Sequence, residues 1–507
     1  MSARFSRVHS GELSGIDARR VEVEVDLHVG LHSFSIVGLA DKALSEARER
    51  VGAALKNSGV KPPSQENRKI IVNLAPADVK KTGSQYDVAI AVGYLLATEQ
   101  VRPFDAAGMM FLGELALDGA VRPVQGVLSI ACMARDTGFS ELYVPEGNAE
   151  EAALAHGIRI FPVSTLTGLI AHLEGRVLLP PVSVGSHAVV LRDPVVDIAD
   201  VRGQSAAKRA LLIAACGGHH MLMSGSPGSG KTMLAQAFAG LLPPLSHDEV
   251  IEVTRIYSAS GALGSRSAVA ERPFRSPHHT ASASAVVGGG SHPRPGEISL
   301  AHEGVLFLDE LPEFHRDVLE SLREPLESGR VTIARSRGSL SLPTRFILVA
   351  AMNPCPCGYY GDARRDCSCG AHEIARYRKK ISGPILDRID LQVAVPHVEL
   401  TDLSAARGSD DFSTKRAQEI VIRVRAIQHA RQGSLNSALS SKQVSAGMAL
   451  DLSARSFFEK IWKGAMLSAR GYYRLLKVAR TIADIDAELV VSERHAAEAF
   501  AYRLRES

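Results

Sequence analysis

The chain has 507 residues, of which 45% are hydrophobic and 22% are charged, and its formal net charge is +3. This length exceeds what one hydrophobic core usually holds and predicts a globular protein of about two to four domains. A net charge this small does not by itself indicate nucleic-acid binding. Evidence for such binding has to come from local patches of basic residues.

The beginning of the chain and its apolar runs bear on its location. The first residues, MSARFSRVHSGEL, lack the apolar stretch of a secretion signal. The longest apolar runs, such as VAIAVGYLLA, are shorter than the roughly 20 residues that cross a bilayer. We therefore expect a cytoplasmic protein without a membrane partner.

Residues 1–172 mix strand-like and helical patterns. Apolar runs that alternate or continue predict strands, and apolar residues at helical spacing predict helices. The strand-like runs are 21–29, 34–39, 68–76 and 142–146, and the helical runs are 42–59 and 87–99. The pattern indicates an α/β or α+β domain, followed by a linker at 173–194 that is rich in Pro, Val, Gly and Ser.

Residues 195–395 and 396–507 predict two further domains. The strands HMLMSG, GVLFLDE and RFILVAAMN are apolar on both faces and are separated by helical patterns, which indicates a parallel sheet covered by helices. Beyond 396, the helical spacing in 413–432, 455–467 and 468–485 predicts an all-α domain. The fold class is therefore multidomain α/β with a helical end.

The stretch GSPGSGKT at 225–232 follows a predicted strand and precedes a predicted helix. Its glycines let the backbone turn tightly and direct successive N–H groups at one anion, and the dipole of the following helix adds to this site. Lys231 is expected to reach the β- and γ-phosphates of ATP, and the Thr232 hydroxyl to ligate Mg²⁺. The cofactor-binding residues of this P-loop are Gly225, Ser226, Pro227, Gly228, Ser229, Gly230, Lys231 and Thr232.

Polar residues end two other strands of the predicted sheet. Asp309 and Glu310 end the run VLFLDE, and Asn353 ends RFILVAAMN. Open α/β sheets bind ligands at the carboxyl edge, where all three would lie. In a chain with a P-loop, Asp309 is expected to hold Mg²⁺ and Glu310 to polarise the attacking water. For Asn353, a water-orienting amide and a turn former before Pro354 are both open.

The segment RVTIARSRGSLSLP predicts a β-hairpin with Arg335 and Arg337 on one face. From Arg330 to Lys380 there are ten Lys and Arg residues against three acids, a local charge of +7. Basic side chains of this kind supply sequence-independent affinity for the phosphates of DNA. An exposed basic hairpin that holds neighbouring acids is the other interpretation.

Two clusters contain residue types that ligate metals. The loop CPCGYYGDARRDCSC at 355–369 has the form C-x-C-x₉-C-x-C, and four thiolates would close tetrahedrally on Zn²⁺, although C-x-C is tighter than the usual spacing. Reduced unligated thiols and an Fe–S cluster remain open. The four residues are Cys355, Cys357, Cys367 and Cys369. His278 and His279 have no Cys or carboxylate at matching spacing, which favours phosphate contact or loop packing.

The segment GPILDRIDL places Arg388 between Asp387 and Asp390. A structural salt bridge is one interpretation. The other is an arginine finger, which one subunit supplies to the γ-phosphate held by its neighbour. The second interpretation requires a ring of subunits.

The order of these motifs resembles that of an AAA+ ATPase: P-loop, DE strand, Asn-ended strand, LDR segment and helical lid. RPGEISLAHEGVLFLDEL, GPILDRIDL and SARGYYRLLKVARTIADI are similar to the magnesium-chelatase-like branch, specifically to the YifB/ComM proteins. The resemblance runs over essentially the whole chain. It implies a central AAA+ domain, ATP and Mg²⁺ as cofactors, and self-association into a homohexameric ring.

The resemblance also implies roles for individual residues. Arg388 would act in trans, and Arg470 would be the sensor arginine of the lid, with Arg474 one helical turn further as the alternative. Gln204 matches a segment that lies near the adenine in such ATPases, and ordinary helix packing is the other interpretation of the apolar residues in this segment. The residues that would serve ATP in cis are Lys231, Thr232, Asp309, Glu310 and Asn353. Because a hairpin grips nucleic acid in the pore of related helicases, Arg335 and Arg337 would be DNA-binding residues.

The first domain resembles the Lon-type protease domain of the ribosomal-S5-like fold. KKTGSQYDVAIA and FLGELALDGAVRPVQGVLSIA carry this resemblance. The nucleophile of that family falls on or next to Gln85, with Ser84 one position away, and its lysine falls on Leu128. Without a nearby amine as base, the Ser84 hydroxyl stays a weak nucleophile. We expect no peptidase activity, and a ring-building or substrate-docking role for the domain instead.

Three functions compete on these observations. The first is an ATP-driven helicase on single-stranded or branched DNA, which the resemblance connects to branch migration of recombination intermediates during natural transformation. The second is the ATPase subunit of a metal-chelatase-like complex, and the third is a protease-like regulator or scaffold without peptidase activity. The local basic charge favours the first, and the intact ATP motif argues against a passive scaffold.

Overall fold

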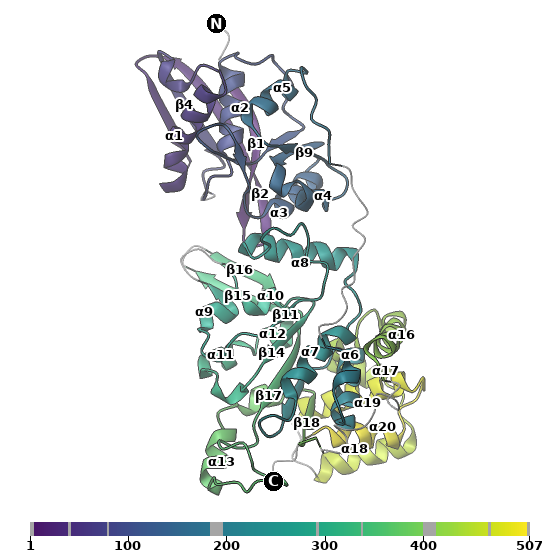
Figure 1. Cartoon of the computed structure of the whole chain (residues 1–507). Helices are drawn as coiled ribbons and strands as arrows, with labels where there is room; N and C mark the ends of the chain where they lie inside the picture. Colours follow the sequence, from purple (N-terminus) through teal and green to yellow (C-terminus); the bar gives the residue numbers. More distant parts are fainter. Residues whose placement is uncertain are drawn as a thin grey trace. The chain divides into compact units, whose positions relative to one another are not determined.

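The structure is a computed structural model that describes residues 5–38, 42–78, 81–182, 196–289, 294–335, 338–398, 412–464 and 468–503. The chain divides into two compact units (Figure 1). The front unit comprises Met1–Val189 and His247–Val269, and the P-loop unit comprises Val190–Ser246 and Ala270–Ser507. Among the described residues, we find no helix with the length and apolar character needed to cross a bilayer.

The front unit is built on a seven-stranded mixed sheet with the strand order β3-β4-β2-β1-β5-β8-β9. β1 pairs antiparallel with β2 over the whole length of β1, whereas β5, β8 and β9 run parallel. The strands are β1 Phe5–Ser14, β2 Asp17–Val29, β3 Ser33–Val37, β4 Arg68–Ala75, β5 Met109–Phe111, β6 Glu114–Leu115, β7 Val121–Arg122, β8 Glu141–Pro145 and β9 Arg159–Val163. The helices are α1 Lys42–Asn57, α2 Asp87–Ala97, α3 Val127–Asp136, α4 Ala149–Ala153, α5 Leu166–Leu173 and α8 His247–Ser260.

Helices cover both faces of this sheet. Along β5, Phe111 belongs to one apolar cluster with α1 and α2, and Met110 belongs to another with α3 and α4. Successive side chains of a strand point to opposite faces, so this alternation shows two buried faces. The domain predicted at 1–172 extends further, because the Val182 N–H donates to the Ile160 carbonyl oxygen at 2.8 Å and keeps the start of the expected linker on the front unit.

Helix α8 belongs to the front unit, although its sequence lies in the region 195–395 that predicts the P-loop domain. It packs on α3. Arg255 on α8 pairs with Asp17 at 2.8 Å, and the Ser258 hydroxyl donates to the buried carboxylate of Glu151 while accepting the Gly126 N–H at 2.9 Å. Buried hydrogen bonds of this kind fix the helix to the front unit, a contact that local sequence patterns do not reveal.

The P-loop unit contains a five-stranded parallel sheet with the order β11-β14-β17-β10-β18, which confirms the predicted parallel sheet. The strands are β10 Met221–Ser224, β11 Phe274–Arg275, β12 Gly288–Gly289, β13 Arg294–Pro295, β14 Val305–Leu308, β15 Arg330–Arg335, β16 Gly338–Pro343, β17 Ile347–Met352 and β18 Leu391–Ala394. The helices before and among them are α6 Ser205–Gly217, α7 Lys231–Leu241, α9 Ala283–Val287, α10 Glu297–Leu300, α11 Arg316–Ser321, α12 Pro325–Ser328, α13 Ala371–Arg378 and α14 Gly383–Leu386.

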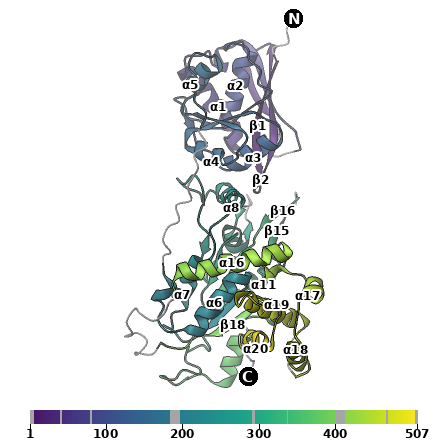
Figure 2. The same ribbon diagram turned by 90° about the vertical axis from the view of Figure 1, so that its right-hand side faces the viewer.

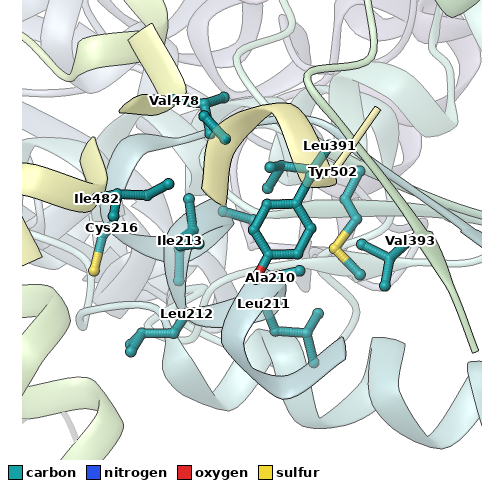
Figure 3. Packing of buried hydrophobic residues seen from close by; sticks show 14 of the residues in the cluster. Ala210, Leu211, Leu212, Ile213, Cys216, Leu391, Val393, Val478, Ile482 and Tyr502 are labelled. Carbon is teal, nitrogen blue, oxygen red and sulfur yellow. The ribbon is translucent and has the colours of Figure 1, made fainter. Parts of the chain in front are cut away.

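The C-terminal helices share one core with this sheet. They are α16 Thr414–Gln432, α17 Ser441–Gly447, α18 Leu452–Gly464, α19 Ala469–Ile485 and α20 Glu493–Ala501. Figure 2 shows α16 lying across α6 and α7. Figure 3 shows side chains of α6, β18 and α19 packed together, among them Ile213, Leu391 and Val478. Because this apolar cluster is continuous, the helical end at 396–507 forms one compact unit with the sheet.

Candidate nucleotide site

The P-loop connects the end of β10 to the first residue of α7. Gly228 and Gly230 have φ values of +77° and +91°, in the left-handed region that side chains disfavour. Gly225 passes close to the chain after β18, since a Cβ at this position would lie 2.1 Å from the Val395 carbonyl oxygen. Positive φ values and a close backbone approach therefore explain why the motif has glycine at these three positions. The loop delivers Lys231 to the N-terminus of an 11-residue helix, where the dipole favours an anion.

Lys231 lies at the centre of the loop. Its Nζ donates to the carbonyl oxygens of Gly225 at 2.6 Å and Ser226 at 2.9 Å, and to Asn353 Oδ1 at 3.3 Å. Burial lowers the pKa of Lys231 from its ordinary value. The end of β17 thus brings Asn353 to the P-loop lysine, as the strand pattern predicted for the carboxyl edge of the sheet.

Two acids follow β14 at the same edge. Asp309 Oδ2 accepts a hydrogen bond from the Thr232 hydroxyl at 3.1 Å, and Asp309 Oδ1 accepts the Glu310 N–H at 2.9 Å. A hydroxyl and a carboxylate side by side offer the oxygen ligands that Mg²⁺ prefers. Glu310 has φ +53°, a left-handed conformation that costs energy for a non-glycine residue and is found most often at functional sites.

A cavity of about 270 Å³ adjoins these acids. It is lined by Ser276, Pro277, His278, His279, Asp309 and Glu310. His279 Nδ1 lies 3.3 Å from Glu310 Oε2, and the His278 and His279 rings lie 4.1 Å apart between centroids. The two histidines, for which the sequence left phosphate contact and loop packing open, therefore share a cavity with the two acids.

Gln204 precedes α6 in a left-handed conformation, with φ +57°. Its side-chain amide donates to the Pro396 carbonyl oxygen at 2.5 Å and lies 3.4 Å from the Ser229 carbonyl oxygen. The residue thus joins the P-loop to the segment that follows β18.

The four cysteines of the 355–369 loop lie together. Their sulfur atoms all lie within 4.8 Å of one another, and Cys355 Sγ is 3.3 Å from Cys357 Sγ and 3.6 Å from Cys367 Sγ. Tetrahedral ligands at a Zn–S distance of about 2.3 Å stand roughly 3.8 Å apart, so four thiolates in this arrangement fit a zinc ion. The backbone N–H of Tyr359 helps to hold the pKa of the Cys357 thiol below its usual value.

Arg388 lies at the opposite edge of the sheet from the P-loop. It precedes β18, which runs parallel to β10 with Met221 opposite Leu391, whereas the P-loop follows the other end of β10. Only 7% of the Arg388 side chain is exposed, and its guanidinium donates to Glu327 on α12 and to the Pro384 carbonyl oxygen. The hydrogen bond from Arg388 lowers the pKa of Glu327.

The two arginines of α19 have different surroundings. Arg470 is 59% exposed and lies 3.3 Å from Glu327, the carboxylate that also binds Arg388. Arg474 donates to the buried Asp390 at 2.6 Å and to the Arg388 carbonyl oxygen at 2.7 Å. Arg474 therefore supports the structure around Arg388, and Arg470 is the better candidate for contact with a ligand.

The predicted hairpin is confirmed, with Val331 of β15 opposite Leu342 of β16 and Arg335 opposite Gly338. Arg337 lies outside the described residues, and so does the side chain of Arg335. The base of the hairpin contacts α12, since the Thr332 hydroxyl donates to Glu324 at 3.0 Å.

The positions of the front unit that match the catalytic residues of the Lon-type protease domain have structural contacts instead. Gln85 donates to the buried Glu12 at 2.9 Å, and the Ser84 hydroxyl donates to Glu114. Leu128 is fully buried. These side chains satisfy one another or fill the core, and Leu128 offers no amine to activate a serine.

Two residues of interest were missed at the level of sequence: Glu327 between two arginines, and Asp362, whose carboxylate accepts the Ser226 hydroxyl at 2.5 Å. Each contacts a motif residue that is distant in the chain. An isolated acid in a charged segment has no local signature, so a fold was needed to find Glu327 and Asp362.

Profiles of three families match the chain. The profile for subunit ChlI of Mg-chelatase matches residues 23–148, the profile for magnesium chelatase, subunit ChlI, matches 197–403, and the profile for the C-terminal part of that subunit matches 411–503. The matches therefore include the P-loop, both acids after β14, the cysteine loop and the C-terminal helices.

Several curated proteins are similar to the chain. Competence protein ComM of Haemophilus influenzae is 42% identical over 499 residues, which cover 98% of this chain and 97% of the relative. Uncharacterized protein YifB of Escherichia coli is 42% identical over 503 residues, with 98% and 97% covered. A Lon protease of Rhizobium meliloti is 27% identical over 171 residues, which cover 33% of this chain and 21% of that protease.

Proposed function

The chain belongs to the YifB/ComM family of magnesium-chelatase-like AAA+ proteins, and from this premise we propose that it is an ATP-driven, ring-forming DNA motor. Its substrate would be single-stranded or branched DNA. The observation that carries the proposal is the pairing of Lys231 with Asn353 and of Thr232 with Asp309 at one edge of the sheet.

ATP hydrolysis follows from the chemistry of these groups. Lys231 and the N–H groups of the P-loop would bind the phosphates, and Thr232 and Asp309 would hold Mg²⁺. When bound, the ion would supply charge neutralisation for the transferred phosphoryl group. Glu310 polarises the attacking water, and Asn353 orients it. Gln204 contributes to nucleotide binding from the other side of the P-loop.

The proposed roles of Arg388 and Arg470 require a second subunit. Arg388 and Arg470 meet at Glu327, at the amino edge of the sheet, and the four paired residues of β10 and β18 alone separate that edge from the P-loop by about 10 Å. Both arginines are therefore proposed to act on ATP bound by a neighbouring subunit. Repeating such a head-to-tail contact closes a ring, which the family resemblance makes a hexamer.

DNA is the proposed substrate because of the segment around the hairpin. The segment from Arg330 to Lys380 has a local charge of +7, and Arg335, the last residue of β15, is followed two positions later in the sequence by Arg337. A ring with basic hairpins in its pore grips phosphates irrespective of sequence. The Haemophilus relative is a competence protein, which supports a role in natural transformation. The proposed role is that of a cytoplasmic helicase that drives branch migration of recombination intermediates.

The cysteine loop is proposed to hold structural Zn²⁺. The donors are Cys355, Cys357, Cys367 and Cys369, and their sulfur atoms have the separations that tetrahedral coordination requires. Four thiolates select zinc over Mg²⁺, which prefers oxygen ligands. Bound zinc would cross-link a segment that has no helix or strand of its own between Met352 and Ala371.

The test of the motor is the steady-state ATPase rate without DNA and with single-stranded, duplex and forked DNA, at two salt concentrations. We expect stimulation that falls steeply with salt because phosphate contacts release counterions. The variant Arg335→Ala/Arg337→Ala should lose the stimulation. Its matched control, Lys415→Ala/Arg416→Ala on α16, removes the same charge and should keep it.

Two outcomes would redirect the proposal. ATP hydrolysis that no DNA stimulates would argue against a DNA motor, and stimulation by a tetrapyrrole-binding partner instead would favour the chelatase-like function that the family profiles describe. Degradation of an unfolded protein would contradict the expectation of no peptidase activity drawn from Gln85 and Leu128.

A further inference from the structure

The cysteine loop packs directly against the P-loop. Gly358, with φ +88°, comes so close that a Cβ there would lie 2.7 Å from Pro227 Cδ. Pro227 is the third residue of GSPGSGKT and directly precedes Gly228. Nothing larger than glycine fits at this contact without moving one of the two loops.

A buried carboxylate forms the second contact between the loops. Asp362 Oδ2 accepts the Ser226 hydroxyl at 2.5 Å, and only 3% of the Asp362 side chain is exposed. His397 Nε2 lies 3.2 Å from the same carboxylate, and the Arg364 N–H donates to Oδ1 at 2.8 Å. The hydrogen bond from Ser226 lowers the pKa of Asp362, so the group stays ionised at neutral pH.

The segment that carries these contacts needs a restraint of its own. Gly358 and Asp362 both lie between the two cysteine pairs, in a stretch without helix or strand. Cys355 is buried, and its sulfur accepts the Tyr360 N–H at 3.3 Å, while Cys369 Sγ accepts the Cys357 N–H at 3.4 Å. Backbone N–H groups directed at sulfur support thiolate ligands. A metal at the four sulfurs would close this loop and remove most of its conformational freedom.

We propose that metal bound by the four cysteines braces the P-loop through Gly358 and Asp362, and that Asp362 is a positioning residue for nucleotide binding. The inference rests on the proposed binding of ATP and zinc. With the metal in place, Asp362 fixes Ser226 and so the orientation of the N–H groups that receive the phosphates. Without the metal, the P-loop becomes ordered only when the nucleotide binds. The free-energy cost of this ordering makes the net free energy of nucleotide binding less favourable and so raises the Kd.

The experiment measures the Kd for a fluorescent ATP analogue with Mg²⁺, in the absence of DNA. The full-length protein is compared as purified, after metal removal by a thiolate-competing chelator, and after reloading with Zn²⁺. We expect about one metal ion per chain in the first sample. We expect affinity to fall roughly tenfold on removal and to return on reloading.

Variants separate the brace from a general loss of structure. Asp362→Ala should weaken binding about tenfold, whereas Asp362→Asn, which still accepts the Ser226 hydroxyl, should bind within about twofold of the unchanged protein. Asp366→Ala removes an exposed acid of the same loop and is the matched control. In Asp362→Ala, metal removal should have a clearly smaller effect than in the unchanged protein, because one of the two contacts that transmit it is already gone and only the Gly358 contact remains.

Several results would overturn the inference. They are a purified protein without metal, a metal-free protein that binds nucleotide as tightly as the loaded one, and an effect of metal removal that is as large in Asp362→Ala as in the unchanged protein. Failure of the proposed function is distinguishable. If Lys231→Ala binds as well as the unchanged protein, the ATP site itself is wrong, and if DNA has no effect on turnover, the binding results still stand.

Discussion

The two edges of the five-stranded sheet present opposite kinds of site. At the carboxyl edge, Lys231 and Asp309 lie within reach of Asn353 and Thr232, and the acids adjoin a cavity. At the amino edge, Arg388 is buried against Glu327. The first set can engage a nucleotide at the P-loop of its own chain, whereas the second lies at the opposite end of β10 and β18 from that loop. The difference teaches that a nucleotide within the same chain accounts for the carboxyl-edge residues alone, and the proposed role of Arg388 requires a second subunit.

The largest expected effect is at the carboxyl edge. Lys231→Ala removes the cation of the P-loop and should weaken nucleotide binding by more than about 100-fold, since a charge-assisted contact to phosphate and its geometry are both lost. Nucleotide titration by fluorescence measures this, with Lys442→Ala on α17 as a control for the loss of one exposed lysine. Retained binding would mean that the phosphates lie elsewhere.

At the amino edge, Arg388→Ala should leave binding intact and lower turnover by about 10³-fold, the range of an arginine finger. Arg376→Ala, an exposed arginine of α13, is the control. If Arg388 acts in trans, mixing this variant with Glu310→Gln should restore hydrolysis, because some sites then combine an intact Glu310 with an intact Arg388. A mixture no more active than the two variants alone would place Arg388 in cis.

Glu310→Gln should keep nucleotide binding and lower hydrolysis by about 10²-fold, the usual contribution of a general base. Gln keeps the size of the side chain, so the left-handed backbone at this residue is undisturbed. Single-turnover hydrolysis measures the loss. If hydrolysis is unchanged, another group at the cavity is the general base. His279, which lies 3.3 Å from Glu310, is then the first residue to test.

The smallest effect is expected where the two arginines meet. Glu327→Gln keeps a hydrogen-bond acceptor but removes the charge that Arg388 and Arg470 share, and a partly exposed ion pair of this kind contributes about 1 kcal/mol, or roughly fivefold. We expect turnover to fall about fivefold with binding unchanged, and Glu324→Gln on the neighbouring turn to be nearly neutral. If the two variants lower turnover equally, Glu327 has no specific role in turnover.

The two edges also differ in how far the sequence predicts them. The P-loop and the acids at 309–310 follow from residues adjacent in the chain, because glycine geometry and strand order are local properties. The contacts of Arg388 and Arg470 with Glu327 join residues 61 and 143 positions apart, and the contact of Asp362 with Ser226 joins residues 136 apart. Such contacts depend on packing, which no local pattern encodes. The parallel sheet and the helical end were predicted, but the membership of α8 in the front unit was not.

The placement of α8 has a consequence for synthesis of the protein. Residues 247–269 complete the front unit, yet they follow the P-loop and α7 in the chain. A ribosome therefore finishes the front unit only after it has already delivered the first strand and helix of the next one, and the two units have to fold concurrently rather than in succession. For the same reason, a cut at residue 190 releases neither unit whole, and any exchange of front units between relatives has to carry two separate stretches of sequence.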